Sequence, residues 1–126
     1  MQLTCTVEHP METEGDRRYI SLDIGVESFT VKEIHLKSSK PVIRLVDTLH
    51  GNILRVKVPF RYNRVMCKVT GDKTVQELVK GDTVRVHLKY CGWWIAGEYG
   101  GPSWKLVSLT ASSNPSEPET RLQPQR

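Results

Sequence analysis

The chain has 126 residues, of which 38% are hydrophobic and 25% charged, and its net charge is +4. This length predicts a single domain, and the lack of an apolar run of about 18 residues argues against a membrane-spanning helix. The first residues show no basic segment followed by an apolar one, so we expect no secretory signal and an intracellular protein, cytoplasmic or nuclear.

The positive charge is concentrated in the middle of the chain. Residues 1–34 contain three basic and seven acidic residues, whereas residues 35–105 contain thirteen basic and five acidic ones. A concentrated positive field on a small domain is typical of proteins with a polyanionic partner. The alternative interpretation is a solvated, slightly basic surface.

The two ends of the chain are expected to differ from its centre. Residues 1–17 are predicted to form an N-terminal arm or an edge strand. Residues 111–126 are polar and rich in proline, and such a composition buries too little surface to offset its ordering entropy, so a disordered tail is predicted. The domain itself is expected over residues 18–110.

Between these ends, alternating apolar and polar residues predict β-strands. The expected strands cover residues 18–26, 29–36, 40–49, 53–60, 64–70, 82–90 and 103–110. In the fourth of these, Leu54, Val56 and Val58 alternate with Arg55 and Lys57, which predicts a half-buried strand with a basic outer face.

One segment between the strands suits a helix. Val75, Leu78 and Val79 are spaced i, i+3, i+4, and Gly81 stands at a C-cap position. We therefore predict a helix of one or two turns over residues 74–80.

The segment YCGWWIAGEYGGPSWKL, residues 90–106, holds all three tryptophans of the chain. Trp104 and Phe60 are in phase with inward residues and are expected in the core, and Tyr90, also in phase, is expected to be partly buried. Trp93 and Trp94 are adjacent, and neighbours in an extended segment point to opposite faces. At least one of the two is therefore expected to be exposed, next to the basic face.

From residue 41 the expected order is strand, strand, strand, short helix, strand, strand. This layout, and the segment GDTVRVHLKYCGWWIAGEYGGPSWKLVSL in particular, resembles small OB-fold single-stranded-DNA-binding proteins over about residues 41–110. The resemblance implies a mostly β fold, an OB-fold-like five-stranded barrel with one short helix between strands three and four. It also implies a viral or phage protein that acts in DNA replication, and a binding face on the second and third strands.

Single-stranded nucleic acid needs cations for its phosphates and flat rings on which its bases stack. We predict binding of such a strand, DNA rather than RNA, with low sequence specificity. The candidate residues are Arg55, Lys57, Arg61, Tyr62, Arg64, Lys68, Arg85, Lys89, Trp93, Trp94 and Tyr99.

The alternative is a protein–protein interaction module that grips its partner with the exposed aromatic hairpin. A partner such as a replication protein could also contact the N-terminal arm, and self-association as a homodimer is a third option. A continuous basic track leading past an exposed tryptophan would favour nucleic acid, whereas a tryptophan among apolar residues away from that track would favour a protein.

Catalysis and cofactors are not expected. The three cysteines are widely spaced and the four histidines fall at no metal-ligand spacing, so neither disulfides nor a metal is predicted. No group of residues suggests a catalytic site, and we predict that the protein is not an enzyme.

Overall fold

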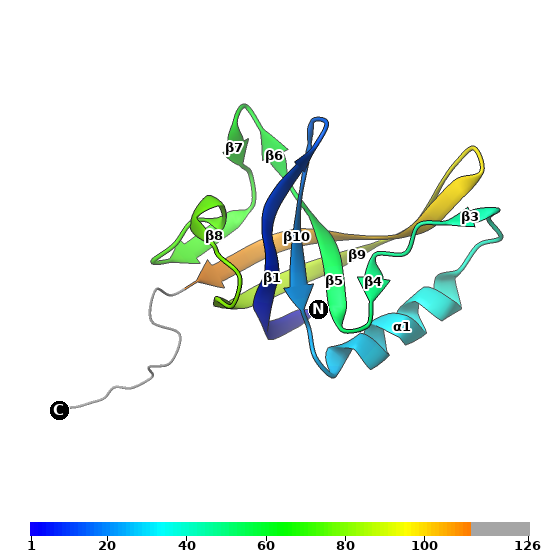
Figure 1. The fold of residues 1–126 in the computed structure, drawn as a ribbon, viewed down its shortest axis with the longest axis horizontal. Coiled ribbons are helices and arrows are strands. Elements are labelled where there is room, and N and C mark those ends of the chain that lie inside the picture. Colours follow the sequence, from blue (N-terminus) through cyan, green and yellow to red (C-terminus); the bar gives the residue numbers. More distant parts are fainter. Residues whose placement is uncertain (112–126) are drawn as a thin grey trace.

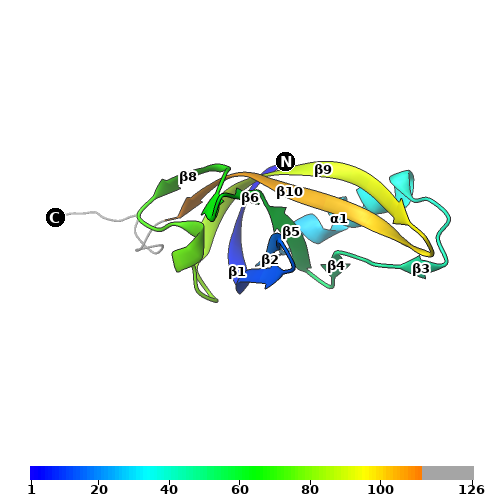
Figure 2. The same cartoon turned by 90° about the horizontal axis from the view of Figure 1, so that it is seen from above.

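The computed structural model describes residues 1–111 (Figures 1 and 2). Of the tail predicted for residues 111–126, only Ala111 is described, as the last residue of a strand, and the rest lies outside this range. The described chain is mostly β, as predicted, and its strands are β1 (Gln2–Glu14), β2 (Arg17–Asp23), β3 (Arg44–Leu45), β4 (Leu49–His50), β5 (Ile53–Val58), β6 (Phe60–Arg61), β7 (Arg64–Val65), β8 (Lys68–Gly71), β9 (Thr83–Ala96) and β10 (Tyr99–Ala111). The described residues also contain one α-helix, α1 (Glu27–Ser38), and one 3-10 turn, η1 (Val75–Glu77). No helix among them is long and apolar enough to cross a membrane.

The main sheet curls until it meets itself. β1 pairs with β2, β2 with β5, β10 with β9, and β9 with β1, all antiparallel. A parallel contact between β5 and β10, at Lys57 and Lys105, closes the ring of five strands. The closed order is therefore β1–β2–β5–β10–β9–β1.

Alternate residues of these five strands fill the interior of the ring. Their side chains are almost completely buried, and the largest are Val7, Ile20, Leu22, Leu54, Val56, Val58, Leu88, Trp104, Leu106 and Leu109. Burying one such aliphatic side chain contributes about 1.5–3 kcal/mol. The inward positions predicted for residues 53–60 and 82–90 are confirmed, with the exception of Phe60, which is only half-buried.

The N-terminal segment, predicted as an arm or an edge strand, is a strand of the ring and not a loose arm. Residues 2–6 of β1 pair with β9 and residues 6–14 pair with β2, so its second half has a strand partner on one side only. Leu3, Cys5 and Val7 alternate with threonines and point inward. The second half of β1 is polar, contains Pro10, and pairs with β2 through two register shifts, and this irregularity hid the strand in the sequence.

The strand predicted for residues 29–36 is the helix α1. Its buried positions are Ser28, Val31 and His35, with Ile34 half-buried, which is helical spacing. Two of these positions carry polar residues, whereas Phe29 and Leu36 are 70% and 76% exposed. The apolar pattern therefore does not follow the buried face, and alternation alone was misleading.

Three further expectations are corrected. The strand expected over residues 40–49 is reduced to the two-residue strands β3 and β4, and that expected over residues 64–70 to the short β7 and β8. The helix expected over residues 74–80 is only the 3-10 turn η1, where the backbone N–H of Thr74 donates to Glu77 Oε1. The single α-helix thus lies between β2 and β5, and not before β9.

Candidate nucleic-acid interface

The longest feature of the fold is the hairpin of β9 and β10. It runs along the whole molecule, with β8 near one end and with α1 and β3 near its tip (Figures 1 and 2). The strands expected at residues 82–90 and 103–110 are parts of it, and the turn at Gly97 joins them. The hairpin contributes to the ring at one end and extends past it at the other.

A row of three lysines crosses this hairpin and β5. Lys105 of β10 is paired in register with Lys89 of β9 and with Lys57 of β5. Residues that face one another across neighbouring strands project on the same side of a sheet. Trp104 and Leu106, which flank Lys105, are buried, so the three lysines lie on the outer face.

The same outer face continues toward β8. There Lys68 is paired with Ser108, and Ser108 with His87. One step further, Thr70, Thr110 and Arg85 form the next row, in which the two threonine hydroxyls are 2.7 Å apart. Lys68 and Arg85 are both exposed, so they extend the row of lysines along the hairpin.

Toward the tip, the outer face becomes aromatic. Alternation along β10 from Lys105 places Gly101 and Tyr99 on this face, and Trp94 is the register partner of Gly101. Trp94 is 39% exposed and Tyr99 50% exposed. We call this set the outer track; it consists of Lys57, Lys68, Arg85, Lys89 and Lys105 with Trp94 and Tyr99.

The cations of the outer track lack carboxylate partners. Within residues 1–111, none of them forms an ion pair with a carboxylate, a property that they share with some other cations such as Arg17 and Arg61, whereas Lys37 pairs with Glu33 and Lys80 with Glu8. In this part of the chain, the track therefore carries positive charge that no ion pair neutralises. A surface of this kind attracts a polyanion.

Arg55, a sequence candidate, is placed differently. Its guanidinium lies 3.1 Å from Glu14 Oε1 and 3.9 Å from Glu12 Oε1, and its other contact is the ring of Tyr19, whose centroid is 3.8 Å away. Two carboxylates thus neutralise Arg55, although it occupies the same strand and the same face as Lys57.

Arg61, Tyr62 and Arg64 form a separate feature. β6 and β7 pair only with each other in the described chain, as a two-stranded sheet. The turn between them has positive φ at Tyr62 and Asn63, and the Tyr62 side chain is 81% exposed. No strand pairing places Tyr62 on the outer track.

Trp93 lies on the face opposite to Trp94, as their adjacency predicted. It lines a hollow of about 240 Å³ together with His35, Leu45 and Pro102. Its indole nitrogen is buried and has no hydrogen-bond partner in the described part of the chain. The structure therefore separates Trp93 from the candidate track and gives it a packing position beside α1.

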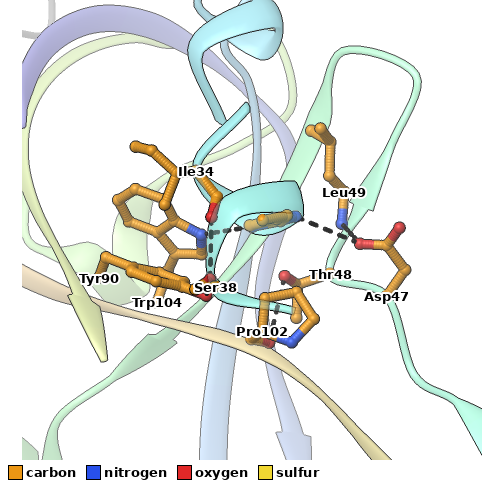
Figure 3. Close-up of polar contacts among 9 residues, drawn as sticks. Ile34, Ser38, Asp47, Thr48, Leu49, Tyr90, Pro102 and Trp104 are labelled. Atoms are coloured by element: carbon orange, nitrogen blue, oxygen red, sulfur yellow. Dashed lines mark hydrogen bonds and ion pairs between the residues drawn. The ribbon is translucent and has the colours of Figure 1, made fainter. Parts of the chain in front are cut away.

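A polar cluster fixes the hairpin on α1 (Figure 3). The indole N–H of Trp104 donates to His35 Nε2 at 2.9 Å, and the hydroxyls of Ser38 and Tyr90 form a second link. His35 Nδ1 lies 3.7 Å from Asp47 Oδ1. Burial lowers the pKa of His35, an effect that Asp47 partly opposes, so at neutral pH the imidazole is uncharged and its Nε2 accepts the hydrogen bond from the indole N–H.

The sequence reasoning missed two residues that belong to this description. Lys105 is central to the row of lysines and could have been found from its outward position in the strand expected at residues 103–110. His35 carried no such signal, because its partner Trp104 is 69 residues away.

Comparison of the chain with protein-family models, with curated proteins and with solved structures gave no match in any of the three.

Proposed function

We propose that this protein binds single-stranded nucleic acid along the outer track. The phosphates lie on Lys57, Lys89 and Lys105, and on Lys68 and Arg85 further along the hairpin. The bases at the other end stack on Trp94 and Tyr99. The observation that carries this proposal is the register of β5, β10 and β9. It places on the face that leads to the exposed tryptophan three lysines that have no carboxylate partner within residues 1–111.

The chemistry of the track suits this class of ligand. Stacking of a base on an aromatic side chain contributes about 1–3 kcal/mol and tolerates any base. The cations add an affinity that falls with salt but does not depend on sequence. Low sequence specificity follows from this combination, and DNA is the expected polymer through the family resemblance of the sequence.

An OB-type barrel is part of the proposal. The closed order of five strands, with one parallel contact between the third and the fifth, supports a five-stranded Greek-key barrel. The proposed face differs from the one that the resemblance implied. The outer side of β2 and β5 carries the ion pairs of Arg55 with Glu12 and Glu14, and the track uses β5, β10 and β9 instead.

The experiment is a titration of fluorescently labelled oligo-dT, followed by anisotropy at several salt concentrations. Lys89→Gln/Lys105→Gln is compared with Lys37→Gln/Lys80→Gln, which removes the same charge from cations that already have carboxylate partners. We expect weaker binding only for Lys89→Gln/Lys105→Gln. In this variant, the slope of the logarithm of the binding constant against the logarithm of the salt concentration should become shallower by about 0.7 for each lost phosphate contact. Equal effects of the two pairs would contradict a specific track, and an oligo-rU arm tests the choice of polymer.

A second candidate function is a protein interface on the opposite side of the hairpin tip. Leu36 of α1, Ile43, Leu45 and Ile95 are between 54% and 79% exposed, and an exposed apolar patch is typical of a protein-binding surface. Ile95→Ser tests it. If this surface binds a protein, the molar mass of the unmodified protein in light scattering should rise with concentration, or the protein should capture a partner. Ile95→Ser should abolish that effect without changing oligo-dT binding.

A further inference from the structure

A basic hollow of about 360 Å³ lies beside the outer track, with which it shares Lys57. Its lining residues come from the turn before β2, from β2 itself, from the end of β5 through β6, and from the residue just after β7; the ribbon of Figure 1 shows the β1–β2 turn next to β6. Four cations line it, namely Arg17, Arg18, Lys57 and Arg61, against one carboxylate, Asp16. Within residues 1–111, none of the four forms an ion pair with a carboxylate. With Asp16 counted, the net charge of the hollow equals that of the row of three lysines, but it is gathered around one cavity.

Arg18 is held in position inside this hollow. Its guanidinium carbon lies 4.3 Å from the centroid of the Phe60 ring, and its Nη1 donates to the carbonyl of Arg17 at 3.2 Å. A guanidinium has five N–H donors, so others remain for a ligand. Arginine forks match the oxygens of a phosphate in pairs, and such charge-assisted hydrogen bonds are about twice as strong as neutral ones.

The remaining walls of the hollow are apolar. Val58, Phe60 and Met66 line it together with the cations. Its volume falls at the lower end of the range of about 300–1,000 Å³ for small-molecule pockets. One nucleotide, with its sugar and base against the apolar wall and its phosphate on the arginines, has the size and the chemistry for this space.

The charge of the hollow favours the end of a strand over its middle. A phosphodiester carries one negative charge, whereas a phosphate monoester carries about 1.5 to 2 at neutral pH. Lys57 belongs both to the hollow and to the row of lysines on the track, so a strand on the track can reach the hollow. We infer that the hollow binds the terminal phosphomonoester of a single strand, and this inference rests on the proposed function.

The test compares oligo-dT of one length with a 5′-phosphate, a 3′-phosphate or neither, in titrations of the full chain. We expect one of the two terminal phosphates to tighten binding by about fivefold over the unphosphorylated oligomer, as one added hydrogen-bonded contact would. Arg61→Gln should remove this gain. The matched control is Arg64→Gln, because Arg64 is the register partner of Arg61 but does not line the hollow, and it should keep the gain.

The outcomes separate this inference from the proposed function. Equal affinity of the three oligomers for the unmodified protein would overturn the inference and leave single-strand binding intact, as would an equal loss of the gain in both variants. Thymidine 5′-monophosphate, followed by the NMR signal of the Met66 methyl group, gives an independent readout. A shift of the Met66 signal without binding of the oligomers would support the hollow and contradict the track. The absence of both the shift and oligomer binding would overturn both proposals.

Discussion

Trp104 and His35, 69 residues apart, are joined by a buried hydrogen bond in which the indole N–H donates to Nε2 of the imidazole at 2.9 Å. Trp104 belongs to β10 and His35 to α1, so this bond ties the helix to the hairpin that carries the outer track. A protonated imidazole could not accept it. The position of the hairpin on α1 therefore depends on a neutral His35.

This dependence predicts a pH effect on stability. The pKa of His35 is lowered by burial from the ordinary value of 6.5, so the folded state binds fewer protons than the unfolded state below that value. The stabilisation from neutral His35 is complete above about pH 6.5 and is lost as the pH falls toward the lowered pKa. Thermal unfolding between pH 7.5 and 5 should show the midpoint falling with pH.

Two variants test this assignment. His35→Gln keeps an acceptor for Trp104 without titrating, so its unfolding midpoint should depend less on pH than that of the unmodified protein. His35→Ala leaves the indole N–H buried without an acceptor and should cost about 1–3 kcal/mol. His87→Gln, on the outer face of β9, is the control, and a pH profile that changes equally in His87→Gln and His35→Gln would contradict the role of His35.

A matched pair on β5 tests whether ion pairing decides which cations bind. Lys57→Gln and Arg55→Gln each remove one charge from the same face of one strand, two residues apart. Because Arg55 is already paired with Glu12 and Glu14, its loss should change oligo-dT affinity less than twofold. Loss of Lys57 should weaken binding by about threefold to tenfold at low salt, and titrations at 50 mM salt compare the two. The reverse order would mean that the strand lies on β2 and β5.

The adjacent tryptophans should separate binding from stability. Trp94→Ala removes a ring that is 39% exposed on the track, and it should reduce oligo-dT affinity by about 1–3 kcal/mol with little change in the unfolding midpoint. Trp93→Ala removes a packed ring beside α1 and should destabilise the fold by about 2 kcal/mol or more. Denaturant unfolding and anisotropy titration of both variants check this, and the opposite pattern would place the binding face beside α1.

Cysteine reactivity tests the placement of the first strand. Burial, and to a lesser extent the charge of Asp23, raises the pKa of the Cys5 thiol to about 12, whereas Cys91 on the hairpin is exposed. Alkylation at pH 8 followed by peptide mass spectrometry should therefore modify Cys91 rapidly and Cys5 only after unfolding. Rapid modification of Cys5 in the native protein would mean that the N-terminal segment is a loose arm after all.

The sequence predicted local patterns well where burial follows alternation. The sequence was enough to predict the inward and outward residues of β5 and β9, the core position of Trp104 and the opposite faces of Trp93 and Trp94. This is because side chains alternate along a strand whatever its partner strands are. The row formed by Lys57, Lys105 and Lys89 could not be predicted from the sequence. The register between β5 and β10, which are far apart in the chain, is set by the closure of the ring.

The errors arose where local patterns conflict with tertiary structure. α1 buries Ser28 and His35 and exposes Phe29 and Leu36, so no apolar stripe marks its buried face. The ion pairs that neutralise Arg55 come from β1, a segment that was expected to be an arm or an edge strand. Counting charges in the sequence assigns Arg55 and Lys57 to the same basic face. Only the carboxylates of the folded β1, Glu12 and Glu14, distinguish them, because they pair with Arg55.

The most direct test of the outer track is tryptophan fluorescence during a titration with oligo-dT at 50 and 200 mM salt, for the unmodified protein and for Trp94→Phe. Stacking of a base on Trp94 should quench the emission, the apparent affinity should fall steeply at the higher salt, and Trp94→Phe should lose most of the quenching while retaining binding by anisotropy. Absence of both quenching and binding at 50 mM salt would contradict single-strand binding. Quenching that persists in Trp94→Phe would place the bases elsewhere than on the outer track.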